Sequence, residues 1–307
     1  MKIGFSSLVS PSWDLDTIVT TASAHGFQGV ELRGLRGELH LPRAPELVRD
    51  KDGVRGLFSD HKVELVCLAA SATLTSRDRR EMARQKATLV EFIELAAALR
   101  CPYVRILAGE AERGEYAPAV LSRIAEALQA LIPVLCRCEV TMLVENGGDF
   151  PASDDLWFLI DAVSHPVIRA CWNQCYAMTH GERATTSVPR LGGKIELVHV
   201  CDATFDEDGT MTEYKPLGQG DCQVAKQTEL LRGVLYDGYV IFEWPKLWLE
   251  SLPAPEAILP EAAKFLRACV DSRQNVLSAY KGDKNAPRIS RRPPSPLSQA
   301  GTSPSPT

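Results

Sequence analysis

Two glutamates and a histidine lie at or near the ends of short hydrophobic runs in this 307-residue sequence. Glu145 lies in VTMLVEN, His199 in IELVHVCD and Glu243 in YVIFEW. Carboxylate oxygens and imidazole nitrogens bind divalent cations, and two facing carboxylates can exchange a proton with a bound molecule. An unpaired carboxylate amid the large apolar groups of the last run would be costly, which favours a functional role for Glu243. The three residues therefore predict a cation site or a proton-transfer pair, provided that the fold brings them together.

Further polar side chains occupy comparable positions near the ends of other hydrophobic runs. We expect contacts with a substrate from Glu31, Arg33, Arg105, Asn146, Tyr176 and Asp202. Asn173 could be a weak cation ligand, a hydrogen-bonding partner of the substrate or a purely structural residue. The two arginines could bind a phosphate or a carboxylate, although ion pairs at a rim would explain them equally well. The segment LGQGD (217–221) could bind a phosphate, but its two glycines are as typical of an ordinary tight turn.

These side chains need a scaffold that brings distant strand ends to one edge. Short hydrophobic runs that predict eight strands occur at 2–7, 29–33, 63–69, 103–108, 140–146, 168–173, 195–202 and 239–244. Helical patterns alternate with them at 15–26, 83–100, 117–135, 153–163, near 183–191, at 222–236 and at 255–273. Such alternation indicates parallel strands with right-handed crossovers, and strands without polar alternation suit a sheet buried on both faces.

The number of repeats favours a closed α/β barrel. An open doubly wound sheet usually has a glycine-rich phosphate loop after an early strand, and neither GxGxxG nor GxxxxGK[ST] follows the first run. The sequence therefore predicts a (β/α)8 TIM barrel, whose functional groups stand at the C-terminal ends of its strands.

Composition narrows the classes of partner. The net charge of -5 gives no general electrostatic reason to bind nucleic acid or an anionic membrane. No stretch is long and apolar enough for a membrane span or a secretory signal. Nine scattered cysteines are best explained as reduced thiols, without the spacing of a structural zinc site. We expect a cytoplasmic protein with a small-molecule partner, and a homo-oligomer is compatible with the sequence.

The C-terminal part of the chain differs in composition from the rest. We expect one catalytic domain over 1–275, and residues 281–307 are rich in Pro, Ser and Arg with few large apolar side chains. A segment of this kind cannot bury enough surface to offset its chain entropy, so we expect a disordered tail.

The motifs VELR (30–33), LVEN-G (143–147), VHVCD (198–202), LGQGD (217–221) and DGYVIFEW (237–244) occur in this order. With them the chain, over about 1–272, resembles the xylose isomerase-like TIM barrels, a superfamily of sugar (phosphate) isomerases and epimerases that also contains endonuclease IV. The resemblance implies a divalent metal ion (Mn, Mg, Co or Zn) held at Glu145, Asn173, His199 and Glu243. It also implies that Glu145 and Glu243 are catalytic.

One part of this chain departs from the pattern of that superfamily. Where the superfamily has a D-x-x-H motif, this chain has Asn173-Gln-Cys-Tyr176. Because an asparagine offers no negative charge, we expect the metal ion to bind weakly or to be absent.

Three functions follow as hypotheses. The first is a metal-assisted isomerase or epimerase of a small polyhydroxylated carbonyl compound, with paired glutamates that move a proton next to the carbonyl group. The second is a dehydratase, a lyase that acts on a keto-polyol with the same groups. The third is a metal-poor, catalytically lapsed binding protein, which Asn173 and Tyr176 favour. A DNA-repair activity is disfavoured, because six histidines are few for a multi-zinc cluster.

Overall fold

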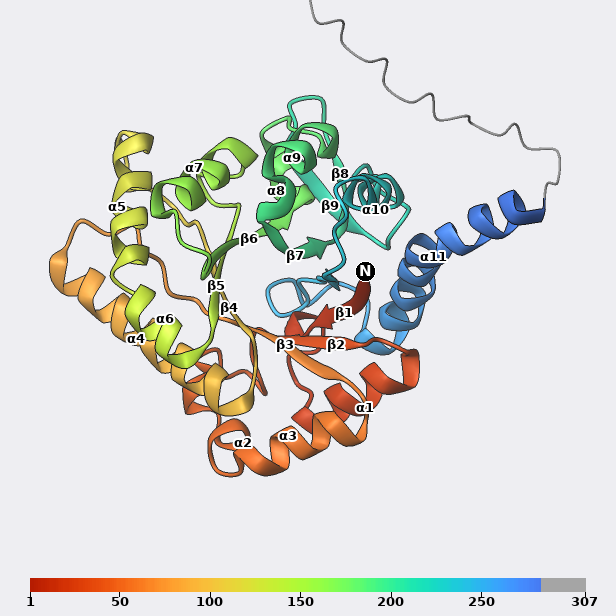
Figure 1. Cartoon of the computed structure of the whole chain (residues 1–307), viewed down its shortest axis with the longest axis horizontal. Coiled ribbons are helices and arrows are strands. Elements are labelled where there is room, and N and C mark those ends of the chain that lie inside the picture. The colour runs from red at the N-terminus through yellow and green to blue at the C-terminus, as the bar shows by residue number, and fades with distance from the viewer. Residues whose placement is uncertain (283–307) are drawn as a thin grey trace, which may run out of the picture. The chain divides into compact units, whose positions relative to one another are not determined.

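A closed barrel of eight parallel strands, ordered β1-β10-β7-β6-β5-β4-β3-β2, lies at the centre of Met1–Val270 (Figure 1). The structure, a computed structural model, describes residues 1–282, with side chains described as far as residue 271. The strands are β1 (Lys2–Ser6), β2 (Gly29–Leu32), β3 (Glu64–Ala69), β4 (Tyr103–Leu107), β5 (Thr141–Glu145), β6 (Ile168–Asn173), β7 (Ile195–Val200) and β10 (Tyr239–Phe242). The prediction of a (β/α)8 barrel is thereby confirmed.

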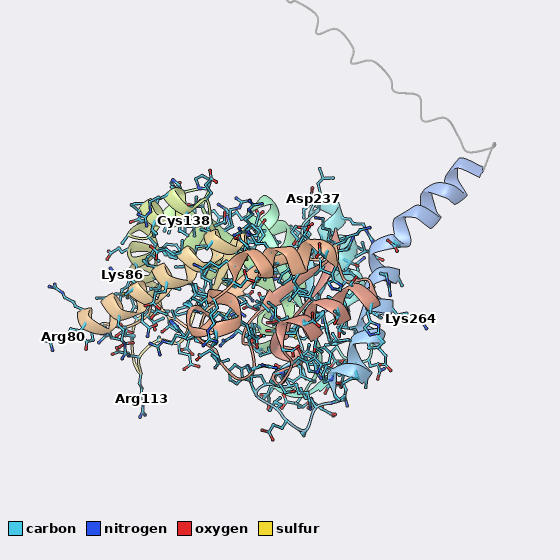
Figure 2. The ribbon with its side chains drawn as sticks, turned by 90° about the horizontal axis from the view of Figure 1, so that it is seen from below. Arg80, Lys86, Arg113, Cys138, Asp237 and Lys264 are labelled. Atoms are coloured by element: carbon cyan, nitrogen blue, oxygen red, sulfur yellow. The ribbon has the colours of Figure 1, made fainter. Side chains whose placement is uncertain are left out.

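Helices surround the barrel and connect its strands (Figure 1). They are α1 (Leu15–His25), α2 (Pro45–Val48), α3 (Lys51–Asp60), α4 (Arg79–Leu99), α5 (Ala117–Gln129), α6 (Ile132–Cys138), α7 (Ser153–Val163), α8 (Gln174–Thr179), α9 (Ala184–Leu191), α10 (Val224–Gly233) and α11 (Pro255–Gly282). Short 3-10 turns occur at Ser7–Val9, Leu41–Arg43 and Gly192–Lys194. Charged side chains such as Arg80, Arg113 and Lys264 point away from the body of the barrel (Figure 2).

Local signals explain where the first helix begins and ends. The Asp14 side chain accepts a hydrogen bond from the Thr17 amide at 2.9 Å, which caps the first turn of α1. Gly26 ends the helix in the left-handed conformation, with φ of 72°. Gly4 lets β1 lie close to β2, its neighbour in the barrel. A Cβ at this position would stand 2.6 Å from the Gly29 carbonyl oxygen.

Two apolar layers hold the barrel together. The larger one fills the space between strands and helices, and includes Phe5, Phe92 and Trp172. A smaller layer inside the barrel is made of Val66, Cys67, Leu143, Cys171, Leu197, Tyr239 and Ile241. The register places polar ends of β6 and β7 beside one another, since Asn173 pairs with His199.

Two predicted elements are divided in the structure. The run 195–202, expected as one strand, ends in the barrel at Val200, and Asp202 begins an antiparallel hairpin of β8 (Asp202–Phe205) and β9 (Met211–Lys215). The helix expected over 117–135 is α5 followed by α6, bent by 43°. Pro133, in the first turn of α6, explains this break, because its ring would clash with the carbonyl four residues earlier.

Other expectations concern the membrane, the cysteines and the tail. Within residues 1–282 no single helix is long and apolar enough to cross a membrane. The bent pair of α5 and α6 reaches that length and composition only when the two helices are taken together. None of the nine cysteines, all in the described part of the chain, forms a disulfide. The segment predicted as a disordered tail, 281–307, lies outside the described residues except for the first two, which end α11.

Candidate functional site

Six polar side chains, five on strands and one directly after β10, meet inside the barrel at the C-terminal ends of the strands. We call them the central cluster: Glu31, Arg105, Glu145, Asn173, His199 and Glu243. Their exposed fractions run from 0% for Glu31 and His199 to 6% for Arg105 and Glu243. The sequence therefore identified the members correctly as neighbours in space, although they are far apart along the chain. Their roles in binding and catalysis stay predictions.

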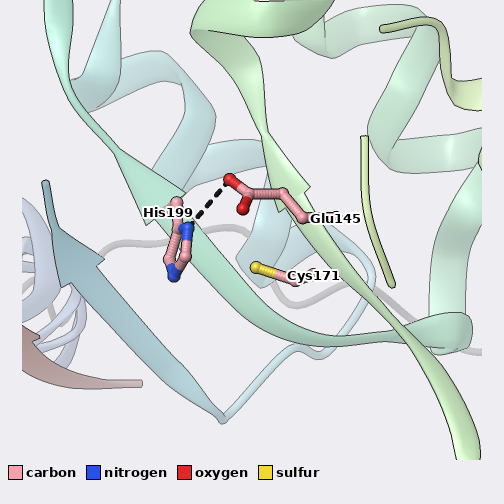
Figure 3. Close-up of side chains that lie close together, drawn as sticks. All are labelled: Glu145, Cys171 and His199. Atoms are coloured by element: carbon pink, nitrogen blue, oxygen red, sulfur yellow. Dashed lines mark hydrogen bonds and ion pairs between the residues drawn. The ribbon is translucent and has the colours of Figure 1, made fainter. Parts of the chain in front are cut away.

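His199 lies between carboxylates on both sides of its ring. Its Nδ1 is 2.9 Å from Glu145 Oε1 and 3.3 Å from a carboxylate oxygen of Glu243; Figure 3 shows the contact with Glu145. Its Nε2 is 3.0 Å from Glu31 Oε2. Carboxylates accept hydrogen bonds, so both ring nitrogens carry protons and the ring is an imidazolium. Burial alone would lower the pKa of His199, but the surrounding acidic groups raise that pKa well above its ordinary value.

Arg105 supplies the second positive charge of the cluster. Its Nε lies 3.2 Å from Glu145 Oε2, and its Nη2 lies 3.8 Å from oxygens of both Glu31 and Glu243. Three buried carboxylates thus face two buried cations, Arg105 and His199. The charges nearly cancel, as burial requires.

Asn173 joins the two glutamates that are the proposed catalytic pair. Its Nδ2 donates to Glu145 Oε1 and to Glu243 Oε2, both at 3.0 Å. Its Oδ1 accepts from the Cys175 amide at 3.1 Å and caps α8. Because a main-chain amide can only donate, this bond fixes which end of the Asn173 side chain faces the cluster. That end is the N–H end.

The three carboxyl groups differ in proton affinity, although all three are buried. Burial favours the neutral form of Glu31, yet His199 and Arg105 outweigh it and lower the pKa of Glu31 to about 2. For Glu145, burial is likewise outweighed by Arg105 and His199, which lower its pKa. Glu243 is the exception: burial, with repulsion from Glu145, exceeds the attraction of His199 and raises its pKa to about 7. Glu243 is therefore the member that can exchange a proton near neutral pH.

The cluster contains groups of side chains that could hold a metal ion. Ligand atoms lie within 4.8 Å of one another in the set Glu31, His199 and Glu243, and in the set Glu145, Cys171 and His199 (Figure 3). The donors as arranged do not fit the four-residue set that the resemblance implies. Asn173 directs N–H groups toward the site, and both nitrogens of His199 carry protons instead of a free lone pair. Burial raises the pKa of the Cys171 thiol to about 12, so the thiolate needed for metal binding is disfavoured.

Arg33 and Tyr176 lie at the edge of the central cluster. The Arg33 guanidinium stacks 5.4 Å above the Trp248 ring, and its buried Nη1 has no hydrogen-bond partner among the described residues. Burial, followed by repulsion from Arg105, lowers the pKa of Arg33 to about 10. Burial and then the charges of Glu145 and Glu243 raise the pKa of Tyr176. The charges of the cluster thus act on both side chains, and their contact with a substrate stays a prediction.

Asn146 and Asp202, expected to contact a substrate, instead use their hydrogen bonds within the protein. Asn146 binds the main chain of Asn173 through both ends of its amide, at 2.8 and 2.9 Å. The Asp202 carboxylate accepts four main-chain amides, from Ala203, Gly218, Gly220 and Cys222. The amides of LGQGD that could have bound a phosphate are thus occupied by an internal carboxylate. These two residues position loops.

The sequence analysis missed Ser6. Its hydroxyl donates to Glu31 Oε1 at 2.9 Å and is fully buried. A polar residue at the end of the first hydrophobic run was the available signal, and the same strand-end rule that selected Glu145 would have selected it.

A closed parallel barrel with acidic and basic side chains gathered at the carboxyl ends of its strands belongs to the class whose chemistry takes place at that face. The chain belongs to the xylose isomerase-like TIM barrel family, whose model matches residues 19–269.

Solved structures of this superfamily superpose on most of the chain. An IolI protein with a bound zinc atom has a TM-score of 0.77 at 18% identity, covering 89% of this chain and 99% of its own. An L-ribulose 3-epimerase has a TM-score of 0.73 at 16% identity, with 93% and 99% covered. A probable 3-DHS dehydratase, AsbF from Bacillus anthracis, has a TM-score of 0.69 at 15% identity, with 87% and 98% covered. At these identities the likeness concerns the fold. No curated protein matches the sequence.

Proposed function

We propose that the protein is an isomerase or epimerase of a small polyhydroxylated carbonyl compound, with Glu243 as the base that removes the proton next to the carbonyl group. The observation that carries this proposal is the Asn173 bridge, which holds Glu145 and Glu243 at 3.0 Å from one amide nitrogen. Two carboxylates held in one place can serve the two faces of a planar intermediate.

The difference in proton affinity assigns the roles. With a pKa raised to about 7, Glu243 changes its charge near neutral pH, and it is one of the two most exposed members of the central cluster. Glu145, whose pKa is lowered, stays ionised and orients His199 and Arg105. Proton removal next to a carbonyl places negative charge on the carbonyl oxygen. The guanidinium of Arg105, which is 6% exposed where His199 is 0% exposed, is the buried cation that can stabilise it.

Epimerases and a probable dehydratase among the similar structures support a reaction that begins with proton abstraction. The proposed reaction uses no divalent ion, because Asn173 and His199 present N–H groups where ligands would be required. Charge stabilisation rests on Arg105 and His199 instead.

Deuterium exchange tests the proposal. The purified protein is incubated in D2O with a panel of ketoses, aldoses and keto-acids, and NMR follows loss of the proton next to the carbonyl group. We expect exchange with one member, falling about 100-fold or more in Glu243→Gln. The matched control is Glu250→Gln, an exposed carboxylate on the loop after β10.

The same spectra separate the alternatives. An isomeric product agrees with the proposal, whereas loss of water identifies a dehydratase. Undiminished exchange in Glu243→Gln would remove the proposed base. A wild type that exchanges no member of the panel would favour a binding protein, for which the nearly complete burial of the central cluster is the supporting observation.

A further inference from the structure

We propose that a cavity between α9 and α10 is a second binding site, for a phosphate monoester. The cavity has a volume of about 540 Å³ and is bounded by α8, by the start of α9 and by the start of α10. No member of the central cluster lines it. Figure 1 shows α8, α9 and α10 as neighbours on one side of the barrel.

The beginnings of two helices meet at this cavity. Ala184 and Thr185 of α9 line it from one side, and Gln223 and Lys226 line it from the other. No side chain of the described residues caps either helix. Across the described residues, the first two amides of each helix have no hydrogen-bond acceptor, and those of α9 belong to Ala184 and Thr185, which line the cavity. Unsatisfied amides and the positive ends of two helix dipoles favour an anion.

The charged side chains around the cavity favour the same kind of ligand. Arg183 and Lys226 line it, against one acidic residue, Asp221. Asp221 already accepts the Phe205 amide at 3.0 Å. Lys226 is exposed, and among the described residues it pairs only with the exposed Glu229, at 2.9 Å, an interaction that water and salt weaken. Arg183 has no ion pair within the described part of the chain, so both cations can turn toward a bound anion.

Two buried glutamines supply an independent signal that the cavity takes a ligand. Gln174 and Gln227 line it, and they are only 3% and 1% exposed. The Nε2 of each donates to the main chain, at Glu182 and Cys222 respectively. The Oε1 of each is buried and has no donor among the described residues. A buried acceptor without a donor costs about 1–3 kcal/mol, and a ligand with hydroxyl groups would satisfy it.

The combination defines the chemistry of the ligand. The helix starts and the two cations suit a phosphate group, while the glutamine oxygens suit O–H donors on the organic part of the molecule. A cavity of this volume has room for more than the phosphate alone. A small polyol phosphate satisfies both halves of the site, whereas inorganic phosphate satisfies the first.

Calorimetric titration with glycerol 1-phosphate, inorganic phosphate and glycerol tests the proposal. We expect the ester to bind more tightly than inorganic phosphate, and glycerol not to bind. Arg183→Gln and Lys226→Gln should each weaken ester binding about 5-fold or more. Arg113→Gln, which removes an exposed charge from another loop, should leave binding unchanged. Gln227→Met should weaken the ester more than inorganic phosphate.

Arg33→Gln distinguishes this cavity from the mouth of the barrel. We expect ester binding to survive this change, because Arg33 does not line the cavity. Binding that is lost in Arg33→Gln but kept in Arg183→Gln would move the phosphate to the central cluster and overturn the proposal. Absence of ester binding by the wild type at millimolar concentration would also overturn it. Circular dichroism of each variant checks that the fold is kept.

Discussion

Replacing Asn173 by aspartate changes the charge of the central cluster without changing the size of the side chain. The substitution keeps the cap on α8, since a carboxylate oxygen can still accept the Cys175 amide. It removes both N–H bonds, to Glu145 and to Glu243, each 3.0 Å long. It also places a third acidic group against that pair.

The structure sets the size of the effect. Hydrogen bonds to charged groups contribute about 1.5–3 kcal/mol each, so the loss of two amounts to roughly 3–6 kcal/mol. Protonation of one of the three crowded carboxyl groups limits further repulsion. Against a typical total stability of about 5–15 kcal/mol, Asn173→Asp should be clearly less stable than the wild type in the presence of a chelator.

A divalent cation should reverse part of this loss, because the variant adds a fourth carboxylate to the central cluster and no longer presents N–H groups to the site. A free cation concentration of 100 times Kd adds about 2.7 kcal/mol to the free energy of unfolding. The assay is urea unfolding followed by circular dichroism at pH 7.5, with EDTA or with Mn²⁺. Gln129→Glu, which converts an exposed amide to a carboxylate, controls for adventitious metal binding.

Two results would refute this reasoning. One is an Asn173→Asp variant that is as stable as the wild type in EDTA, since the bridging hydrogen bonds would then contribute nothing. The other is a wild type that Mn²⁺ stabilises as much as it stabilises the variant, which would show that the native donors do accept a metal ion.

Three further predictions concern the charges and the loop near the central cluster. The pKa of Glu243 rises from 4.5 to about 7 on folding, so its contribution to stability should fall by roughly 3 kcal/mol as pH rises from about 4.5 to 7. Urea titrations across this range should show a smaller decline in stability for Glu243→Gln than for the wild type. An equal decline in both proteins would contradict the raised pKa of Glu243. Arg105→Met should destabilise the protein by about 3–5 kcal/mol, because the three buried carboxylates would then face one cation, His199. Thermal unfolding would measure the loss, and a small shift in Tm would contradict it. Full recovery of stability at lower pH would show that the loss comes from charge and not from packing. Asp202→Asn should lower the free energy of unfolding by about 2 kcal/mol or more, because its NH2 group would face two of the four amides that the carboxylate now accepts. Amide hydrogen exchange at 217–222 should become faster. Unchanged exchange would show that the carboxylate does not hold the loop.

The barrel could be predicted because strands buried on both faces leave a strong pattern. Runs such as YVRILA and IRACWN contain hardly any polar alternation, and each is followed by a helical segment. The end of β6 at Asn173 was predicted correctly. The hairpin of β8 and β9 was not predicted, because the run 195–202 has no glycine or proline to mark the break between β7 and β8 at Cys201.

The members of the site were easier to predict than their roles. Parallel strands bring their carboxyl ends together, so Glu145, His199 and Glu243 followed from position alone. What Asn146 does could not be derived, because its amide hydrogen bonds depend on the register between β5 and β6. The same holds for the direction of the Asn173 amide, which a single main-chain donor in α8 decides.

Charge balance in the central cluster explains why an uncharged asparagine at position 173 accompanies the buried cation Arg105. At neutral pH the ionised Glu31 and Glu145 oppose the cations Arg105 and His199, and Glu243 is near the midpoint of its titration. The cluster is therefore close to neutral without any added ion, and a carboxylate at position 173 would leave an excess negative charge in a buried space. An asparagine there avoids that excess, and its N–H groups hold the two glutamates that a cation would otherwise hold. The same neutrality leaves Glu243 free to take up or release a proton at little cost, which is what a base next to a carbonyl group requires.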